Sequence, residues 1–315
     1  MTKKKLIISI ISILCAVALS VGVVLGIIEY MGYAKYKYTV LDTLPDGQGK
    51  RATVILLAGQ SNAAGCSIDE YLRQNVSSEK YAEYEDGYDN VYINYYVTAT
   101  NASNSFVKCT VNQGERGGYF GPELGMAEKL AEAYPDEMFF IIKYTWSASN
   151  LYEDWLSPTS VGRTGEKYKQ LVRYVHTSMQ YLRSKNYDVD IEGMCWMQGE
   201  SDSFSVENAT DYEVHLTNFI ADTRREFGGY ASSDIMFVDA YIADLPAYWV
   251  YGELVNRSKL AVSNADERNI LIDTISEGLT TLYEPTGDPD RAHYDSASEI
   301  KLGHLFAQAL APYLD

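Results

Sequence analysis

The chain has 315 residues, of which 46% are hydrophobic and 22% are charged. This composition excludes a wholly disordered chain and suits one domain of about 250 residues with an additional tail. There are 26 lysines and arginines against 43 acids, which gives a net charge of −17. Because such an acidic protein repels phosphate groups, its charge disfavours nucleic-acid binding and adsorption to anionic lipid.

The first 28 residues differ in character from the rest of the chain. Lys3, Lys4 and Lys5 precede an uncharged run of 23 residues that ends at Ile28. At about 1.5 Å per residue, a helix of this length crosses a bilayer, whereas a cleaved signal peptide usually has an apolar core of about 7–15 residues. We therefore expect residues 1–28 to form a signal anchor, with the lysines cytoplasmic and the body at the cell surface. A cleaved signal peptide, and with it a secreted protein, remains the alternative, and this helix is the only expected membrane contact.

The polar, tyrosine-rich segment 29–50 predicts a stalk, and residues 51–315 predict the folded domain. Outside residues 1–28 there are three cysteines, at positions 66, 109 and 195. An odd number allows at most one disulfide within the chain, and a Cys66–Cys109 bond is conceivable.

Short apolar runs alternate with amphipathic segments along the domain. Strands are predicted over 53–57, 91–98, 138–144, 191–197, 235–240 and 270–272, and helices over 122–134, 167–185, 210–227, 248–265 and 296–313. The rest of segment 66–118 is polar and predicts a long irregular insertion. The alternation predicts a single three-layer α/β domain whose parallel sheet is covered by helices on both faces. Ligands in such folds bind at the carboxyl ends of the strands.

Three polar segments lie at or near predicted strand ends. They are Gly59 to Asn62 after the first strand, Trp196 to Asp202 after the strand 191–197, and Asp290 to His293 before the last helix. A serine hydroxyl becomes a nucleophile when a base lies within about 3 Å, a third group orients that base, and donors stabilise the oxyanion. Each segment alone has an ordinary reading as a turn or a helix cap, but their joint occurrence in this order predicts a serine hydrolase site.

These segments resemble the sequence blocks of the SGNH hydrolases in their Gly-Gln-Ser-Asn variant. That variant marks the sialate O-acetylesterase-like domain, or carbohydrate esterase family 6, which includes acetylxylan esterases. The stretch 55–65 matches the first block, 196–202 the W-x-Q-G-E-x-D block and 290–293 the D-x-x-H block, while 121–125 resembles the G-P-x-x-G segment. The resemblance spans residues 53–310 and implies a flavodoxin-like SGNH fold.

The resemblance also implies catalytic roles. Ser61 would be the nucleophile, His293 the general base and then the acid, and Asp290 the group that orients His293. The backbone N–H groups of Ser61 and Gly121 and the side-chain amide of Gln198 would form the oxyanion hole.

Three further residues are possible supporting residues. Glu200 either steadies His293 or its neighbours or is structural, Asp202 braces its loop, and Asn62 ties the blocks together. The resemblance implies no metal and no organic cofactor.

Two departures from the family pattern affect the expected site. The family often has a glycine pair after the strand 138–144, whereas this chain has Ser147 and Ala148, whose side chains would narrow the loop. Asp295 follows His293 by two residues and would raise the pKa of His293 if the two side chains were close.

The sequence therefore predicts an esterase that removes O-acetyl groups from an oligo- or polysaccharide, through an acetyl-Ser61 intermediate. Acetylated hemicellulose such as xylan or mannan is the first expected substrate. O-acetylated sialate is the alternative, and its carboxylate calls for an arginine, with Arg116, Arg163 and Arg291 as candidates. Alternatives of another class are an inactive glycan-binding module and a cell-surface acyltransferase.

Overall fold

The structure is a computed structural model that describes residues 32–98 and 100–314. The expected signal anchor of residues 1–28 lies outside these residues. The chain divides into a unit of residues Met1–Tyr38 and a compact domain of residues Thr39–Asp315. No helix in the described ranges combines the length and the apolar character that a membrane crossing needs.

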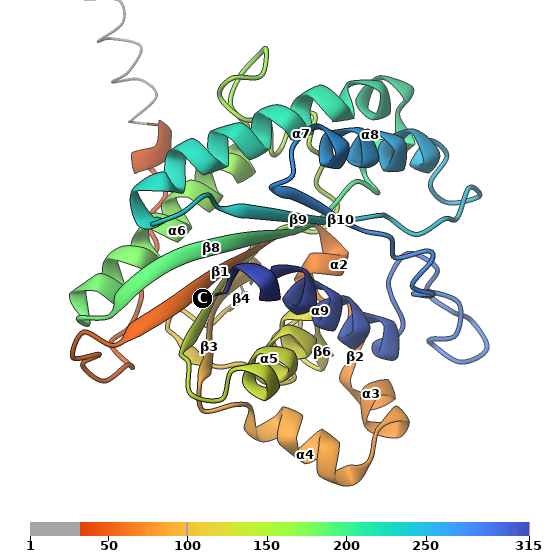
Figure 1. The fold of residues 1–315 in the computed structure, drawn as a ribbon. Helices are drawn as coiled ribbons and strands as arrows, with labels where there is room; N and C mark the ends of the chain where they lie inside the picture. Colours follow the sequence, from red (N-terminus) through yellow and green to blue (C-terminus); the bar gives the residue numbers. More distant parts are fainter. Residues whose placement is uncertain (1–31, 99, 315) are drawn as a thin grey trace, which may run out of the picture. The chain divides into compact units, whose positions relative to one another are not determined.

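The centre of the domain is an eight-stranded, mainly parallel sheet (Figure 1). Its parallel strands, in spatial order, are β3 (Val91–Thr98), β7 (Phe139–Thr145), β1 (Arg51–Gly59), β8 (Asp188–Met197), β9 (Met236–Ala240) and β10 (Asn269–Ile272). Two short strands, β4 (Asn101–Ala102) and β5 (Val107–Lys108), pair antiparallel with β3. The expected sheet is thus present, and its antiparallel additions make it mixed.

Helices cover both faces of the sheet. One face carries α6 (Glu166–Ser184), α7 (Val206–Phe227) and α8 (Gly252–Ala265), and the other carries α5 (Pro122–Ala133) and α9 (Ser296–Leu310) (Figure 1). Helices α5 and α9 cross closely, because a Cβ on Gly125 would lie 2.1 Å from the Ile300 carbonyl oxygen. The three-layer α/β architecture predicted from the sequence is therefore confirmed.

The segment 66–118 is more regular than predicted. It contains α3 (Asp69–Asn75) and α4 (Ser78–Asp86), and its strand β2 (Ser67–Ile68) pairs antiparallel with β6 (Tyr119–Phe120). Tyr81 and Tyr84 provide the buried face of α4 and join a cluster with Phe120 and Ile300. The helix was missed because its apolar face consists of tyrosines among acids, and its packing partners come from distant parts of the chain.

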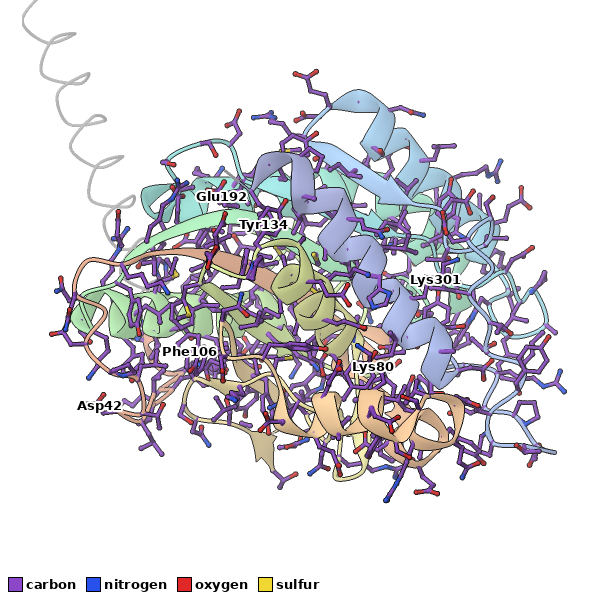
Figure 2. All side chains as sticks on the ribbon, turned by 60° about the horizontal axis from the view of Figure 1, so that its bottom comes forward. Asp42, Lys80, Phe106, Tyr134, Glu192 and Lys301 are labelled. Atoms are coloured by element: carbon purple, nitrogen blue, oxygen red, sulfur yellow. The ribbon has the colours of Figure 1, made fainter. Side chains whose placement is uncertain are left out.

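The domain begins before residue 51, so the expected stalk of residues 29–50 is not a separate segment over its whole length. The Leu41 N–H donates to the Asn104 carbonyl at 2.7 Å, and the Thr43 hydroxyl donates to the Phe106 carbonyl at 2.9 Å. Figure 2 shows Asp42 beside this part of the domain. Leu44 is buried here, and this burial holds the segment against the domain.

Cys66, Cys109 and Cys195 are buried free thiols. The Sγ of Cys109 lies 3.3 Å from the Glu123 carbonyl oxygen. The conceivable Cys66–Cys109 disulfide is therefore not formed.

The site lies where the strand order reverses. Strand β1 has β7 on one side and β8 on the other, and such a switch point leaves a crevice at the carboxyl ends of the strands. Gly59 ends β1 with a φ of 141°, and a Cβ there would lie 2.0 Å from the Met197 carbonyl oxygen. Only glycine fits this turn, which leads the chain into helix α2 (Ser61–Ala64) at the crevice.

Candidate active site

Ser61 opens helix α2 directly after the turn at the end of β1, and it is 8% exposed. The preceding side chain, Gln60, joins this turn to the segment after β8. Its Oε1 accepts hydrogen bonds from the backbone N–H groups of Gly199 at 3.3 Å and Ser201 at 3.2 Å. Two of the polar segments found in the sequence are thus bonded to each other.

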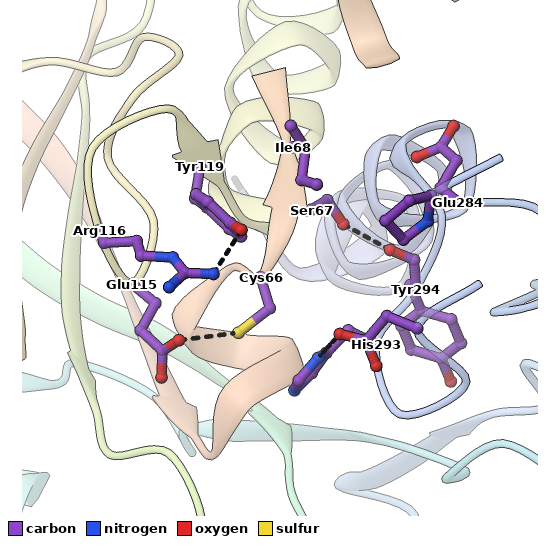
Figure 3. A pocket seen from close by; sticks show the side chains of 11 residues that line it. Cys66, Ser67, Ile68, Glu115, Arg116, Tyr119, Glu284, His293 and Tyr294 are labelled. Atoms are coloured by element: carbon purple, nitrogen blue, oxygen red, sulfur yellow. Dashed lines mark hydrogen bonds and ion pairs between the residues drawn. The ribbon is translucent and has the colours of Figure 1, made fainter. Parts of the chain in front are cut away.

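His293 and Asp290 form a hydrogen-bonded pair in the loop before α9 (Figure 3). The Nδ1 of His293 lies 2.7 Å from Oδ2 of Asp290. Because an ionised carboxylate only accepts hydrogen bonds, Nδ1 carries the hydrogen and Nε2 is left as the basic nitrogen. The pair therefore has the chemistry of a general base with its orienting acid.

Asn62 connects the serine turn to the histidine loop. Its Nδ2 donates to the Ala292 carbonyl at 3.4 Å, and its Oδ1 accepts from the Tyr294 N–H at 3.1 Å. Asn62 is bonded to both residues that flank His293, and it directly follows Ser61 in the chain. This connection brings the predicted nucleophile and the predicted base to the same end of the sheet.

Burial and three carboxylates set the protonation of His293. Burial disfavours the charged imidazolium, but the hydrogen bond and charge of Asp290, together with the charges of Glu200 and Glu115, outweigh it and raise the pKa of His293. The hydrogen bond from His293 in turn lowers the pKa of Asp290. Asp290 therefore favours its ionised form, and His293 is a stronger base than an ordinary imidazole.

Asp295 does not have the expected role beside His293. Its carboxylate accepts hydrogen bonds from the backbone N–H groups of Leu282, Tyr283 and Glu284, at 2.8 to 3.3 Å. These bonds turn the carboxylate toward the preceding loop, which it holds against the start of α9.

Glu200 lies against the side chain of Asn62 and is 1% exposed. Its Oε1 accepts from Asn62 Nδ2 at 2.7 Å, while its Oε2 is buried without a hydrogen-bond partner among the described residues. Burial raises the pKa of Glu200 above its ordinary value. The geometry places Glu200 behind Asn62, where it fixes the orientation of the amide.

Gln198 is completely buried, and its amide is used within the protein. Its Nε2 lies 2.6 Å from Asp202 Oδ2, 3.0 Å from the Ser149 carbonyl and 3.1 Å from Gln60 Oε1. Three acceptors therefore share two hydrogens, and none remains for an oxyanion. Gln198 differs in this respect from the expected oxyanion donor.

Asp202 braces the loop after β7. Its carboxylate accepts from the N–H of Leu151 at 2.9 Å and from the N–H of Tyr152 at 3.2 Å. Burial raises the pKa of Asp202 to about 6. Asp202 thus joins the loop after β7 to Gln198.

The backbone N–H of Gly121, an expected oxyanion donor, is also already hydrogen-bonded within the protein. Its N–H donates to Glu123 Oε1 at 3.0 Å, and Glu123 Oε2 forms a fully buried ion pair with Lys143 Nζ at 2.6 Å. An N–H held by a buried carboxylate is not an open donor for a substrate oxygen. Glu123 belongs to the same sequence block as Gly121, but the block does not show its buried pair with Lys143, because that pair depends on how α5 packs against β7.

The loop after β7 offers other donors. The Trp146 N–H donates to the Gly59 carbonyl at 3.0 Å, which places this loop directly beside the serine turn. Ala148 has a φ of 54°, a left-handed conformation that favours glycine. No hydrogen bond joins the N–H groups of Ser147 and Ala148 to another residue within the described ranges. This loop was noted in the sequence as a departure, but its free N–H groups could not be predicted.

An open pocket of about 250 Å³ lies beside His293 (Figure 3). Its lining residues are Cys66, Ser67, Ile68, Glu115, Arg116, Tyr119, Glu284, Pro285, Asp290, His293 and Tyr294. Five of these eleven residues come from the insertion 66–118, and sequence reasoning selected only Arg116 of that segment as a site residue. The Glu115 N–H donates to the Gly65 carbonyl at 2.8 Å, a contact between distant segments that no motif signals.

Of the three candidate arginines, the structure places Arg116 in this pocket. Its guanidinium lies 4.4 Å from the centre of the Tyr119 ring and donates to the Tyr119 hydroxyl at 2.5 Å. Arg163 lines a different pocket, beside Tyr152, and Arg291 is an exposed neighbour of the Asp290–His293 pair.

Comparison with known proteins gives the same assignment for the fold and also gives the family. A family model described as a carbohydrate esterase, sialic acid-specific acetylesterase, matches residues 51–312. No curated protein matches the sequence.

Among solved structures, the Arabidopsis thaliana protein AT4G34215 is 15% identical, with a TM-score of 0.61 over 86% of this chain and 100% of its own. NanS is 15% identical, with a TM-score of 0.61 over 86% of this chain and 98% of its own. XAC1771, a carbohydrate acetylesterase from Xanthomonas citri, is 18% identical, with a TM-score of 0.57 over 82% of this chain and 56% of its own. These TM-scores show a shared fold, and the family match covers most of the chain and confirms the resemblance seen in its sequence. The protein belongs to the family of carbohydrate esterases described as sialic acid-specific acetylesterases.

Proposed function

We propose that the protein hydrolyses O-acetyl esters on neutral glycans, with acetylated hemicellulose such as xylan or mannan as its substrate. Family membership gives the class, a carbohydrate acetylesterase. The observation that carries the mechanism is the Asn62 side chain, which binds the backbone on both sides of His293 while Ser61 precedes it in the chain. The proposed catalytic residues are therefore Ser61, His293 and Asp290.

In the first step, the Ser61 oxygen attacks the acetyl carbonyl carbon while His293 Nε2 takes the hydroxyl proton. The tetrahedral intermediate then collapses, and the bond between the carbonyl carbon and the sugar oxygen breaks. His293 returns the proton to the sugar oxygen, so the deacetylated glycan leaves and acetyl-Ser61 remains. Asp290 stabilises the imidazolium formed between the two proton transfers.

In the second step, water attacks acetyl-Ser61 as His293 Nε2 removes a proton from it. The ester bond to the serine oxygen breaks, acetate leaves, and His293 returns the proton to Ser61. The side chain of His293 is 25% exposed, so water reaches the base. This access favours hydrolysis over acyl transfer to another polymer, which requires that water be excluded.

The proposed oxyanion donors are the N–H of Ser61 and the N–H groups of Ser147 and Ala148. The first N–H groups of a helix have no partner within that helix, and Ser61 opens α2. Gly121 and Gln198 are left out because buried acceptors already hold their hydrogens.

The charges of the pocket favour a neutral sugar. Glu115, Glu284 and Asp290 line it, against the single cationic side chain of Arg116 and the imidazole of His293. This excess of carboxylates disfavours a substrate that itself carries a carboxylate.

A sialate O-acetylesterase is the second candidate, and the guanidinium of Arg116 in the pocket is the observation that favours it. An inactive glycan-binding module is disfavoured, since the hydrogen-bonded pair of Asp290 and His293 is intact.

Residues 1–28 are proposed as a signal anchor that holds the domain outside the cell, with secretion as the alternative. An acidic domain suits this location. Polymeric glycans occur outside cells, and there the domain does not encounter the phosphate-rich partners that its charge would repel.

The test is acetate release by the full-length protein and its Ser61→Ala variant. The substrates are acetylated xylan, acetylated mannan, O-acetyl sialate and an aryl acetate. Release from xylan or mannan that is lost in Ser61→Ala is expected. Preference for O-acetyl sialate would replace the substrate proposal, and no release by the folded protein would favour the binding module.

A further inference from the structure

Exposed large apolar side chains gather at the carboxyl end of the sheet. Among the described residues there are twelve, and eight lie between the end of a parallel strand and the first turn of the next helix. These eight are Val161, Phe204, Val206, Tyr248, Val250, Ile275, Leu282 and Tyr283. In Figure 1 the loops after β9 and β10 extend from the same end of the sheet as α2. Exposed apolar side chains that are gathered in one place mark a binding surface.

Four of these side chains lie on two neighbouring segments, and we call them the aromatic patch: Phe204, Val206, Tyr248 and Val250. Their exposed fractions are 62%, 54%, 44% and 62%. The two segments that carry them are joined, because the Tyr251 N–H donates to the Ser203 carbonyl at 2.9 Å.

A buried tryptophan supports the patch from below. Trp249 is 7% exposed, and its ring centre lies 5.4 Å from that of Phe204 and 6.1 Å from that of Tyr248. Both exposed rings therefore pack against the ring of Trp249.

The patch is close to the nucleophile. Glu200 is bonded to Asn62, the residue after Ser61, and Phe204 follows Glu200 by four residues. Four residues span at most about 14 Å, and a 3-10 turn over Asp202–Phe204 shortens that distance. A glycan whose acetylated unit lies at Ser61 can thus reach the patch with a further unit along the same polysaccharide.

The charges around the patch favour an uncharged occupant. Val206 is followed by Glu207, whose Oε1 accepts from the Tyr152 hydroxyl at 2.9 Å, and Glu253 lies three residues after Val250. Arg257 lies 3.8 Å from that second acid. Acids beside the rings repel a sialate or an anionic lipid but accept hydrogen bonds from sugar hydroxyls. The C–H face of a pyranose ring supplies the apolar surface that aromatic rings bind.

We propose that the aromatic patch is a subsite that binds a neutral, unacetylated sugar unit of the polysaccharide main chain. This inference rests on the proposed function and extends it, because it makes the protein an enzyme of polymers and longer oligosaccharides. The patch binds the polysaccharide, and the reaction itself takes place at Ser61, His293 and Asp290.

The kinetic test compares the full-length protein with Phe204→Ala/Tyr248→Ala on acetylated xylan and on an aryl acetate. The expected kcat/KM on xylan falls about tenfold, mainly through a higher KM, and at least five times more than on the aryl acetate. Phe204→Tyr, which keeps the ring, is expected to keep the KM for xylan. The matched control is Tyr313→Ala. It removes a tyrosine that is 41% exposed and follows the C-terminal end of α9.

A binding test separates this proposal from the proposed function. Calorimetry measures binding of unacetylated xylohexaose to Ser61→Ala, with and without the two patch substitutions, and needs no turnover. Binding that the substitutions abolish supports the subsite, even if no acetate is released from any ester. Equal binding in both proteins, or equal kinetic losses on xylan and the aryl acetate, would overturn the subsite. A change of oligomeric state with unaltered xylan kinetics would assign the patch to a second copy of the chain and overturn it too.

Discussion

The side-chain oxygen of Asn62 accepts a hydrogen bond of 3.1 Å from the backbone N–H of Tyr294. The same amide donates to the Ala292 carbonyl at 3.4 Å, so one side chain holds the backbone before and after His293. The position of the imidazole relative to Ser61 therefore depends on Asn62 and not on the loop alone. Asn62 is a positioning residue in this arrangement.

Replacing Asn62 tests this role. Asn62→Ala is expected to lower kcat about 10²-fold with little change in KM, because a displacement of about 1 Å between reacting groups costs that much. Asn90→Ala is the matched control, since Asn90 clamps the Tyr134 and Glu137 carbonyls in the same way, at 3.0 and 2.9 Å, far from the site. Steady-state kinetics on an aryl acetate measures both variants. An unchanged kcat in Asn62→Ala would contradict the positioning role.

The pH dependence of the reaction follows from the raised pKa of His293. A general base acts in its neutral form, so activity falls as the pH drops through that pKa. The acidic limb of kcat/KM is expected above 6.5, the ordinary value for histidine. Asp290→Asn removes the charge that raises the pKa, so the limb moves to lower pH while the plateau falls about 10⁴-fold. An acidic limb well below pH 6 in the unaltered protein would contradict this assignment.

Glu200 is expected to act through Asn62. Glu200→Gln keeps an oxygen that accepts from Asn62 Nδ2, so kcat falls only a few-fold, whereas Glu200→Ala removes the acceptor and costs about 10–100-fold. Glu200→Gln also removes a charge that raises the pKa of His293, so the acidic limb moves slightly to lower pH. A purely structural role would not move the limb. Equal losses in the two variants with an unmoved limb would exclude a role in positioning.

The parts of the fold that follow from local chemistry could be predicted. The fully buried runs of β1 and β7 contain only apolar side chains over most of their length, and apolar spacing marks α6 and α7. Helix α4 could not be predicted in this way, because Tyr81 and Tyr84 become its apolar face only when Phe120 and Ile300 pack against them. Its stability comes from tertiary contacts and not from its own pattern.

The candidate site, like the fold, could be predicted from the sequence only in part. The proposed nucleophile, base and orienting acid could be selected from the sequence, since Ser61, Asp290 and His293 lie in short sequence blocks that follow one another in a fixed order. The proposed oxyanion donors could not, because a donor is open only if no other group of the folded chain accepts from it. Glu123 takes the Gly121 N–H, and Asp202 takes a hydrogen of the Gln198 amide.

The left-handed conformation of Ala148 predicts a gain in stability from glycine. This conformation costs a residue with a Cβ about 1–2 kcal/mol, and the greater freedom of glycine in the unfolded chain cancels about half of the gain. Ala148→Gly is expected to raise the free energy of unfolding by about 0.5 kcal/mol, as measured by denaturant titration. Ala221→Gly, at an exposed position of α7, is the control and is expected to lower it by about 1 kcal/mol. Equal destabilisation by both would show that Ala148 is not strained.

Glu128 of α5 predicts how the domain loses stability in acid. It accepts from the Tyr84 hydroxyl at 2.7 Å, lies 2.7 Å from His304 Nε2 on α9 and pairs with Lys80 at 3.1 Å. Burial would raise its pKa, but these three partners outweigh burial and lower the pKa of Glu128 to about 2.

A carboxyl group whose pKa falls on folding stabilises the folded protein at any pH above its pKa in the unfolded chain. This contribution is lost as the pH drops toward its pKa in the folded protein. The contribution of Glu128 is therefore present above 4.5, its ordinary pKa, and is lost between there and about 2. Glu128→Gln is expected to lower the free energy of unfolding by about 2 kcal/mol near pH 7, with the difference shrinking as the pH falls. Glu132→Gln, which removes a half-exposed pair with Lys129, is the control and is expected to cost less than about 0.5 kcal/mol. If the stability curves of Glu128→Gln and the unaltered protein ran parallel down to about pH 3, the three partners would not be what holds this carboxylate charged.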